Sequence, residues 1–274
     1  MSDNFKQNLD LALSNAKRLS NKILIDGKLT FAKSSKKIKV INPSTGDQIG
    51  EAPQCDKIDV DIAVSSAEVA FQKWKKIPAR ERGKMMTSAA RKLEERREEI
   101  ETLLALDTGN ALRTQAKPET AASIELTHMF AGLSGELKGE NYPPNIADTI
   151  HYTTKDPIGV VCAIIPWNAP LFLTAAKIAP AIVAGNTVVL KTAEQAPFCA
   201  LLLCEILQQK LPPGVLNVIS GYGEECGEPL IQHEKVRKVT FTGSFSVGKL
   251  IASKAAPKLC PVTLELGGKN PNII

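Results

Sequence analysis

The sequence predicts an α/β protein built on a doubly wound parallel sheet. From residue 158 onward, short apolar runs of strand length alternate with segments of helix length, as in sheets whose strands are joined by helical crossovers. Three of the apolar runs, 160–165, 188–190 and 239–241, are each followed by a polar or glycine-rich loop. Because ligands bind at the carboxyl ends of the strands in such sheets, these loops predict a binding site at one edge.

The composition is that of a globular protein and argues against several kinds of partner. Of the 274 residues, 43% are hydrophobic and 23% are charged, which allows a large core and favours two structural units over one. The net charge is only +5, and aromatic residues make up 5% of the chain, so we expect no nucleic-acid surface. No apolar run reaches the roughly 18 residues of a membrane-spanning helix, so no membrane partner is expected.

The cysteines and histidines predict neither a disulfide framework nor a metal site. The six cysteines form no CxxC pair and lie mostly in apolar surroundings, as free thiols do in a reducing compartment. The three histidines are scattered, without the spacing of metal ligands. Residues Met1–Phe5 do not begin a signal peptide. We therefore expect a cytoplasmic protein without a metal.

The first half of the chain is expected to form surface helices that carry no chemistry. Apolar residues at helical spacing predict these helices, and Gly109 is expected to end one of them. Asp26-Gly27 predicts a hairpin turn within a region of short strands, residues 22–50. The predicted helices are 1–20, 56–74, 78–108 and 117–137.

Residues 138–158 predict a hairpin. Tyr142-Pro143-Pro144 is incompatible with a helix, and residues 149–154 alternate like an exposed strand. An exposed strand offers unpaired backbone groups, so this hairpin could pair with another subunit. A self-contained surface hairpin fits the same pattern.

The second half of the chain contains the elements of the predicted parallel sheet. Pro166 ends the first strand, because proline cannot donate to a sheet ladder. Gly185-Asn186 and Pro212-Pro213-Gly214 end the first two helices. The predicted strands are 159–165, 187–190, 215–219, 238–241 and 262–266, and the predicted helices are 172–184, 196–209, one from about 224, and 246–254.

Two glycine-rich loops are candidates for binding a phosphate. Gly221–Gly227 has the spacing GxGxxxG instead of GxGxxG, and Glu224 and Glu225 would repel a pyrophosphate there. Gly243–Lys249 reads GxxxxGK, but Leu250 stands where a P-loop needs Ser or Thr for magnesium. The second loop therefore does not indicate a nucleotide triphosphatase. It is better read as a helix start made of small residues, whose free N–H groups face a phosphate.

Three charged residues at predicted strand ends could act in a site. Lys191 and Glu194 could bind neighbouring ribose hydroxyls, the lysine donating and the carboxylate accepting. The alternative is a surface ion pair worth about 0–1 kcal/mol, which composition alone favours. Glu265 ends an apolar strand and could serve as a general base or as a structural hydrogen-bond acceptor.

Taken together, the loop motifs resemble those of the aldehyde dehydrogenase superfamily, in order and spacing, from about residue 20 to residue 274. The resemblance implies a Rossmann-like domain that binds NAD, a hairpin arm that forms dimers and tetramers, and a second domain that supplies a nucleophilic cysteine. The motifs are Pro166-Trp167-Asn168, Ala184–Lys191, Phe241–Ser244 and Leu264–Lys269.

The resemblance also implies roles for individual residues. Lys191 and Glu194 match the residues that bind the adenosine ribose, and the negative charge of Glu194 would disfavour the 2′-phosphate of NADP. Asn168 matches the amide that stabilises the oxyanion of a thiohemiacetal, and Glu265 matches the general base that activates the deacylating water. The other cofactor residues implied are Gly243 and Ser244 at the pyrophosphate, Ile164, Pro166, Trp167, Gly223 and Gly248 lining the cleft, and Leu266 near the nicotinamide.

By this resemblance, residues 1–137 and 159–266 form the NAD-binding domain, 138–158 the oligomerisation hairpin, and 267–274 the start of a catalytic domain. The family's nucleophile belongs a few tens of residues beyond Glu265, and none of the six cysteines matches it. We expect the 274 residues alone to be inactive in oxidising an aldehyde to an acid through a cysteine thioester. The alternatives are a non-catalytic NAD-binding or interaction remnant and one half of a split enzyme. The sequence does not identify the aldehyde.

Overall fold

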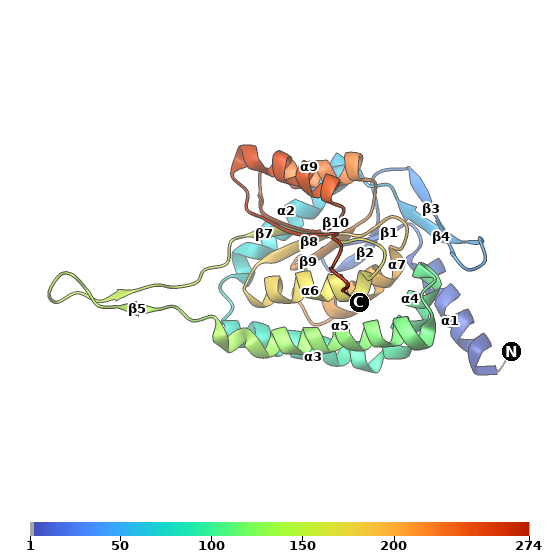
Figure 1. Ribbon diagram of the computed structural model, residues 1–274, viewed down its shortest axis with the longest axis horizontal. Coiled ribbons are helices and arrows are strands. Elements are labelled where there is room, and N and C mark those ends of the chain that lie inside the picture. Colours follow the sequence, from blue (N-terminus) through green and yellow to red (C-terminus); the bar gives the residue numbers. More distant parts are fainter. Residues whose placement is uncertain (1–2, 274) are drawn as a thin grey trace.

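A seven-stranded sheet forms the centre of the computed structural model, which describes residues 3–273 and side chains from Lys6 onward (Figure 1). The sheet order is β11-β10-β7-β8-β9-β1-β2. All neighbouring pairs among β7 to β11 are parallel, which confirms the predicted parallel sheet. The strands are β7 (Val160–Ile164), β8 (Thr187–Lys191), β9 (Leu216–Ile219), β10 (Val236–Gly243), β11 (Val262–Leu266), β1 (Lys22–Ile25) and β2 (Lys28–Phe31).

The first two strands extend the sheet in antiparallel fashion. Asp26 and Gly27 have φ values of 49° and 77°, as the type I′ turn of a tight hairpin requires. This turn joins β1 to β2, and β1 pairs with β9. The sequence predicts the turn but not the sheet to which the strands belong.

Helices cover both faces of the sheet, because successive side chains of each buried strand point to opposite sides. Val161 and Ala163 of β7 enter one apolar cluster, whereas Val160 and Cys162 enter the other. In Figure 1, α9 and α2 lie above the sheet, and α6 lies below it. The face-covering helices are α2 (Lys57–Trp74), α8 (Glu228–Gln232) and α9 (Phe245–Ala255) on one side, and α6 (Pro170–Val183) and α7 (Phe198–Gln208) on the other.

A further helical layer packs on α6 and α7. It differs from the prediction at Arg96, whose backbone leaves the helical region (φ −111°, ψ 21°) and divides the helix predicted for 78–108 into two. Gly109 has φ 75° and ends the second helix as predicted. The layer comprises α3 (Ala79–Glu95), α4 (Arg97–Thr108), α5 (Lys117–Gly132) and α1 (Asp3–Leu19), with a 3-10 turn at Leu133–Glu136 in place of the predicted end of α5.

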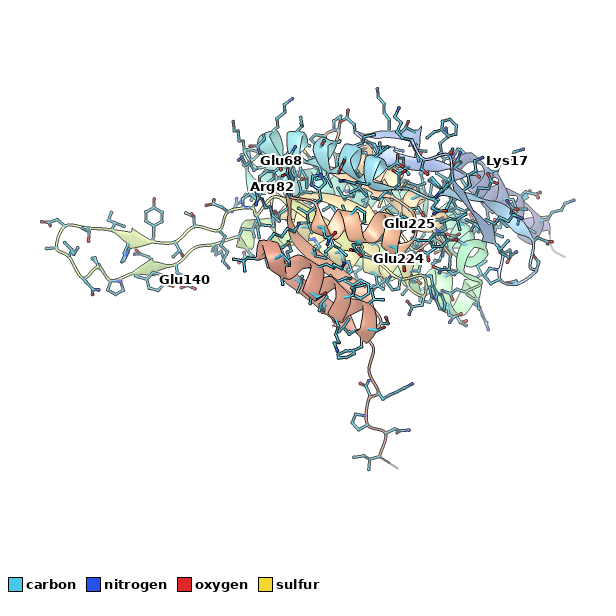
Figure 2. The ribbon with its side chains drawn as sticks, turned by 90° about the horizontal axis from the view of Figure 1, so that it is seen from above. Lys17, Glu68, Arg82, Glu140, Glu224 and Glu225 are labelled. Atoms are coloured by element: carbon cyan, nitrogen blue, oxygen red, sulfur yellow. The ribbon has the colours of Figure 1, made fainter. Side chains whose placement is uncertain are left out.

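A hairpin projects away from this body (Figures 1 and 2). Its strands, β5 (Asn141–Tyr142) and β6 (His151–Tyr152), are antiparallel and much shorter than the predicted exposed strand 149–154. Its two strands form a separate sheet, with pairing between Asn141 and Tyr152 and between Tyr142 and His151. Its apolar residues Ile146 and Ile150 are exposed. A second small hairpin, β3 (Lys37–Ile41) and β4 (Gln48–Pro53), lies near the N-terminal helix.

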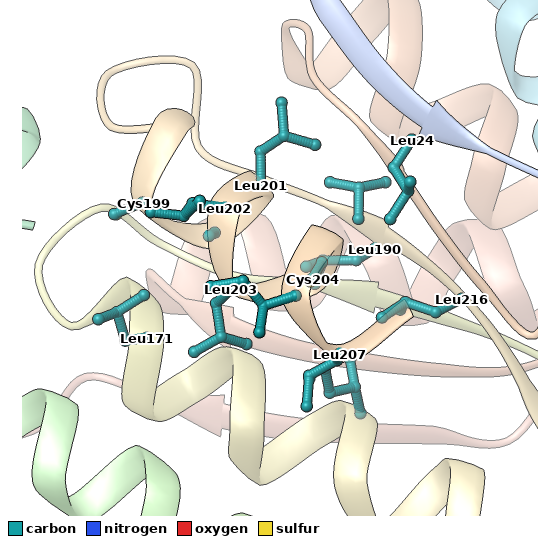
Figure 3. Packing of buried hydrophobic residues seen from close by; sticks show 14 of the residues in the cluster. Leu24, Leu171, Leu190, Cys199, Leu201, Leu202, Leu203, Cys204, Leu207 and Leu216 are labelled. Atoms are coloured by element: carbon teal, nitrogen blue, oxygen red, sulfur yellow. The ribbon is translucent and has the colours of Figure 1, made fainter. Parts of the chain in front are cut away.

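The helix α7 lies deep in the core. All of its residues except Glu205 are buried, and apart from Glu205 and Gln208 it is apolar, so it is stable only when most of its surface is covered. Figure 3 shows Leu201 and Leu207 of α7 close to Leu190 of β8 and Leu216 of β9, while Leu171 of α6 approaches from the other side. The helix predicted from about residue 224 begins as a π-helical turn, Gly223–Gly227 (η3), and the α-helix α8 starts only at Glu228. Among the described residues, no helix is long and apolar enough to cross a membrane.

Candidate active site

The predicted loops meet at the carboxyl edge of the sheet. In the parallel register Ile164 of β7 lies beside Lys191 of β8 and Phe241 of β10, and Thr242 lies beside Glu265 of β11. The residues that follow these strands therefore extend from neighbouring positions. This is the arrangement that the alternation of strands and loops predicts.

A cavity of about 650 Å³ lies between these strand ends and helices α8 and α9. Its size is that of small-molecule and cofactor sites, which span roughly 300–1,000 Å³. Val247, Leu250 and Ile251 of α9 supply an apolar wall. The residues predicted for the cofactor that line it are Ile164, Pro166, Trp167, Lys191, Glu194, Gly223 and Gly243.

The other three residues predicted for the cofactor lie outside the lining of this cavity. Ser244 is the N-cap of α9, and its Oγ accepts a hydrogen bond from the backbone N–H of Val247 at 3.3 Å. Gly248 is buried under Leu266, since a Cβ at Gly248 would lie 2.6 Å from Leu266 Cδ2. Ser244 thus caps α9, Gly248 lets α9 approach Leu266 of β11, and Leu266 lines a different cavity.

Lys191 and Glu194 form an ion pair inside the first cavity. Lys191 Nζ lies 3.5 Å from Glu194 Oε2 and donates a hydrogen bond of 3.1 Å to the carbonyl oxygen of Thr192. Lys191 is only 5% exposed. The pair is therefore not the exposed surface ion pair that composition favours, and its ammonium group is held at the strand end.

A second cavity, of about 660 Å³, lies next to the first and shares Pro166, Thr242 and Gly243 with it. Asn168 and Glu265, to which the family resemblance assigns the roles of oxyanion stabiliser and general base, both line this second cavity. Asn168 lies in the loop after β7, and Glu265 lies in β11, one residue before its end. An amide donor and a carboxylate thus face one space beside the cofactor-sized cavity.

The six cysteines line neither of these cavities. All are buried and free of disulfides. Burial raises the pKa of each thiol, that of Cys226 to about 12. Because the thiolate is the nucleophilic form, these side chains behave as small apolar core residues.

Comparison with known proteins decides the family. The aldehyde dehydrogenase family model matches residues 31–274. The chain belongs to the aldehyde dehydrogenase family.

Relatives are similar along nearly the whole chain. It is 40% identical to phenylacetaldehyde dehydrogenase of Pseudomonas fluorescens, over 100% of this chain and 56% of that protein. It is also 40% identical to retinaldehyde dehydrogenase 3 of Homo sapiens, over 92% of this chain and 50% of that protein. The crystal structure of betaine aldehyde dehydrogenase from Staphylococcus aureus in complex with NAD+ superposes with a TM-score of 0.92 at 34% identity, covering 97% of this chain and 53% of that one. The chain spans about half the length of these relatives.

Within this aldehyde dehydrogenase chain, the structure adds Lys177 to the second cavity. This lysine of α6 is 8% exposed, and its Nζ donates a hydrogen bond of 3.1 Å to Thr240 Oγ1. Burial lowers the pKa of Lys177 to about 8, and the charge of Glu265 opposes that shift. The sequence signal was a single lysine in the otherwise apolar segment 170–183. Its neighbours could not be known without the fold.

Thr242 lies where the two cavities meet and lines both. Its Oγ1 is buried and has no hydrogen-bond partner among the described residues. Buried hydroxyls are rarely left unpaired, so this hydroxyl is available to a bound molecule. The motif Phe241–Ser244 contains this residue, but the sequence assigns it no role.

Glu119 connects the helical first half of the chain to the site. Its Oε1 accepts hydrogen bonds from the backbone N–H groups of Leu171, at 2.9 Å, and Phe172, at 3.3 Å. These groups begin α6, whose own N-cap residue, Ala169, makes no side-chain hydrogen bond. A carboxylate from α5 thus caps the helix that starts beside Asn168. The half of the chain expected to carry no chemistry therefore fixes a loop of the candidate site.

Proposed function

We propose that these residues are the NAD-binding part of an aldehyde dehydrogenase, an oxidoreductase that converts an aldehyde into a carboxylic acid. One observation supports this above all others. Asn168 and Glu265 line one cavity, and that cavity shares Thr242 with the cofactor-sized cavity beside it. The boundary between the two spaces is where a cofactor and an aldehyde would meet.

The residues of the first cavity fit a nicotinamide dinucleotide. Lys191 and Glu194 offer a donor and an acceptor to ribose hydroxyls, and the first turn of α9 after Gly243 and Ser244 offers free backbone N–H groups to a pyrophosphate. The unpartnered hydroxyl of Thr242 offers one more polar contact. When bound, NAD+ accepts a hydride from the substrate.

We further propose that NAD is preferred over NADP. The Glu194 carboxylate lines the cavity next to Lys191. A 2′-phosphate on the adenosine ribose would bring like charge to it, and like charges at short range repel. Crystal structures of relatives such as the Staphylococcus aureus enzyme contain NAD+.

In this proposal the polar residues of the second cavity act on the aldehyde carbon. The Asn168 amide donates a hydrogen bond to the oxygen that becomes negatively charged when a nucleophile adds. Glu265 accepts a proton from the water that releases the acid. The nucleophile is a cysteine outside these 274 residues, since the thiols described here lie in the core. The aldehyde itself stays unassigned, because the relatives are named for different aldehydes.

The proposed assembly is a homodimer or tetramer formed through the hairpin 138–158, whose exposed Ile146 and Ile150 offer apolar area. The free, buried cysteines support a reducing compartment, the cytoplasm. Two alternatives are kept. The chain could be a non-catalytic NAD-binding remnant, or one half of a split enzyme that another chain completes.

Calorimetric titration with NAD+ tests the proposal. We expect saturable binding of one NAD+ per chain, weakened about tenfold or more in Glu194→Ala, because a hydrogen bond to a charged group contributes about 1.5–3 kcal/mol. The matched control is Glu125→Ala, which removes an exposed carboxylate from α5 on the other side of the sheet. Absence of NAD+ binding by the unaltered chain contradicts the proposal.

A second assay separates the alternatives. With an aldehyde and NAD+, the 274 residues alone are expected to form no NADH. A split enzyme gains this activity when a chain with the remaining half is added, whereas a remnant does not. NADH formation by the 274 residues alone would show that the cysteine assignment is wrong.

A further inference from the structure

Glu224 and Glu225 stand at the mouth of the first cavity, the one that contains Lys191, without basic partners. Both are exposed, and both line the cavity together with Glu194 and Glu228. They are labelled next to each other in Figure 2. Among the described residues, the ion pairs of this cavity are Lys191–Glu194 and Lys254–Glu228. Neither includes Glu224 or Glu225.

The turn that carries these two carboxylates, η3, is packed against the end of β8. A Cβ built on Gly227 would lie 3.6 Å from Lys191 Cδ, so the turn touches the stem of that lysine. Cys226, between Glu225 and Gly227, lies close enough to Lys191 and Glu194 for their charges to affect its pKa. Burial raises the pKa of the Cys226 thiol to about 12, the Lys191 charge opposes this rise, and the Glu194 charge adds to it. The acidic turn therefore belongs to the end of the cavity that contains Lys191 and Glu194.

The position of Glu224 and Glu225 is compatible with a bound pyrophosphate, although the sequence argues against one on their own loop. Glu224 and Glu225 argue against a pyrophosphate on their own loop, Gly221–Gly227. The free N–H groups proposed for the pyrophosphate belong to a different element, the start of α9 after Gly243 and Ser244. The two carboxylates thus face the adenosine end of the proposed dinucleotide site. In this site the pyrophosphate is bound by a different loop, the one that begins α9.

The charges that line the cavity as a whole are predominantly negative. Four carboxylates line the cavity, against two lysines, Lys191 and Lys254. A phosphate monoester such as the 2′-phosphate of NADP carries about 1.5–2 negative charges at pH 7. Like charges near a protein surface repel over a Debye length of about 8–10 Å at physiological salt. The ribose of NAD carries no such charge.

We propose that Glu224 and Glu225 form, with Glu194, a carboxylate barrier that excludes a 2′-phosphate and so selects NAD+ over NADP+. This inference rests on the proposed cofactor site and deepens it. Glu194 alone does not account for the selection, because its charge is partly neutralised by Lys191 at 3.5 Å. Glu224 and Glu225 have no such neutralising partner among the described side chains.

Calorimetric titrations with NAD+ and NADP+ test the barrier. In Glu224→Gln/Glu225→Gln we expect NADP+ to bind about tenfold more tightly, while NAD+ affinity changes less than about threefold, because the effect scales with ligand charge. The gain should shrink at about 0.5 M salt, where the charges are screened. Adding Glu194→Gln should increase NADP+ affinity further. Glu125→Gln, which removes an exposed carboxylate from α5, should change neither affinity.

The outcomes separate the two proposals. If the unaltered chain binds neither nucleotide, the proposed cofactor site fails. If NAD+ binds but the double variant leaves the ratio of NADP+ to NAD+ affinity unchanged, or strengthens both equally, the barrier is overturned and the cofactor site stands. Both substituted side chains are exposed, so the variants should fold, and equal melting temperatures would verify it.

Discussion

The carboxylate of Asp107 accepts a hydrogen bond of 2.9 Å from the backbone N–H of Cys199. Asp107 lies near the end of α4, and Cys199 lies in the first turn of α7, whose N-cap residue makes no side-chain hydrogen bond. In the same way, the Glu119 carboxylate of α5 accepts a hydrogen bond from the backbone N–H of Leu171 in the first turn of α6. The outer helical layer therefore supplies caps to both apolar helices that cover this face of the sheet.

The buried carboxyl group of Asp107 should make stability depend on pH. Burial raises its pKa from 3.8 to about 7, so between these values the folded chain holds a proton that the unfolded chain releases. Its contribution to the free energy of unfolding is therefore greatest below about pH 4, falls as pH rises, and levels off above about pH 7. In Asp107→Asn this contribution is removed. Relative to the original chain, the variant should gain stability by a few kcal/mol from pH 4 to pH 7.

Urea unfolding at several pH values measures this difference. The same change at an exposed site, Asp148→Asn in the hairpin, should give a difference that is nearly independent of pH over this range. A flat difference for Asp107→Asn as well would show that its carboxyl group is not perturbed by burial.

Lys177 should titrate near neutral pH. Burial lowers its pKa to about 8, and the Glu265 charge opposes this. Glu265→Gln should therefore move the midpoint of Lys177 to lower pH. The measurement is an NMR titration of lysine side chains labelled at Cε, with the Lys177 signal assigned by its loss in Lys177→Gln. If Glu265→Gln leaves the titration midpoint of Lys177 unchanged, the Glu265 charge does not act on Lys177.

Gly248 has little room for a side chain unless Leu266 moves. An added Cβ would lie 2.6 Å from Leu266 Cδ2, and overpacking of this kind costs about 1–3 kcal/mol. Gly248→Ala should therefore lower the free energy of unfolding, although alanine is the better helix former. Adding Leu266→Ala should recover part of the loss. The matched control is Gly132→Ala at the end of α5, where no atom lies within 4 Å of the added Cβ.

Glu119 should protect the start of α6. Removing its carboxylate in Glu119→Ala leaves the N–H groups of Leu171 and Phe172 without their acceptor, at a cost of about 1 kcal/mol. Hydrogen exchange of these two amides should then be about fivefold or more faster, as that energy implies. Glu119→Gln, which keeps an acceptor oxygen, should exchange at an intermediate rate. Equal rates in all three chains would show that the cap does not hold the helix.

The sheet and its loops were predictable because they depend on local patterns. Apolar runs of strand length ending at Pro166, Lys191 and Gly243 specify parallel strands and place their loops at one edge. The break at Arg96 was not predictable, because its flanking residues favour helix and only packing of α4 against α1 and of α3 against α5 requires two helix directions.

The polar residues also divide into those that a local sequence motif identifies and those that only the fold reveals. Asn168 and Glu265 stand directly at strand ends, where a sequence motif identifies them. Lys177, Glu119 and Asp107 lie within helices, and their importance arises from partners 63, 52 and 92 residues away in the chain. Helical periodicity says which face such a residue occupies, but not which loop or helix end that face meets.

A crystal structure of the chain with NAD+ tests the central claim most directly. The account predicts the dinucleotide in the cavity between β8 and α9, with the adenosine ribose at Lys191 and Glu194 and the nicotinamide at Thr242, where the two cavities meet. A dinucleotide bound elsewhere, or in this cavity with its nicotinamide away from Thr242, would contradict it.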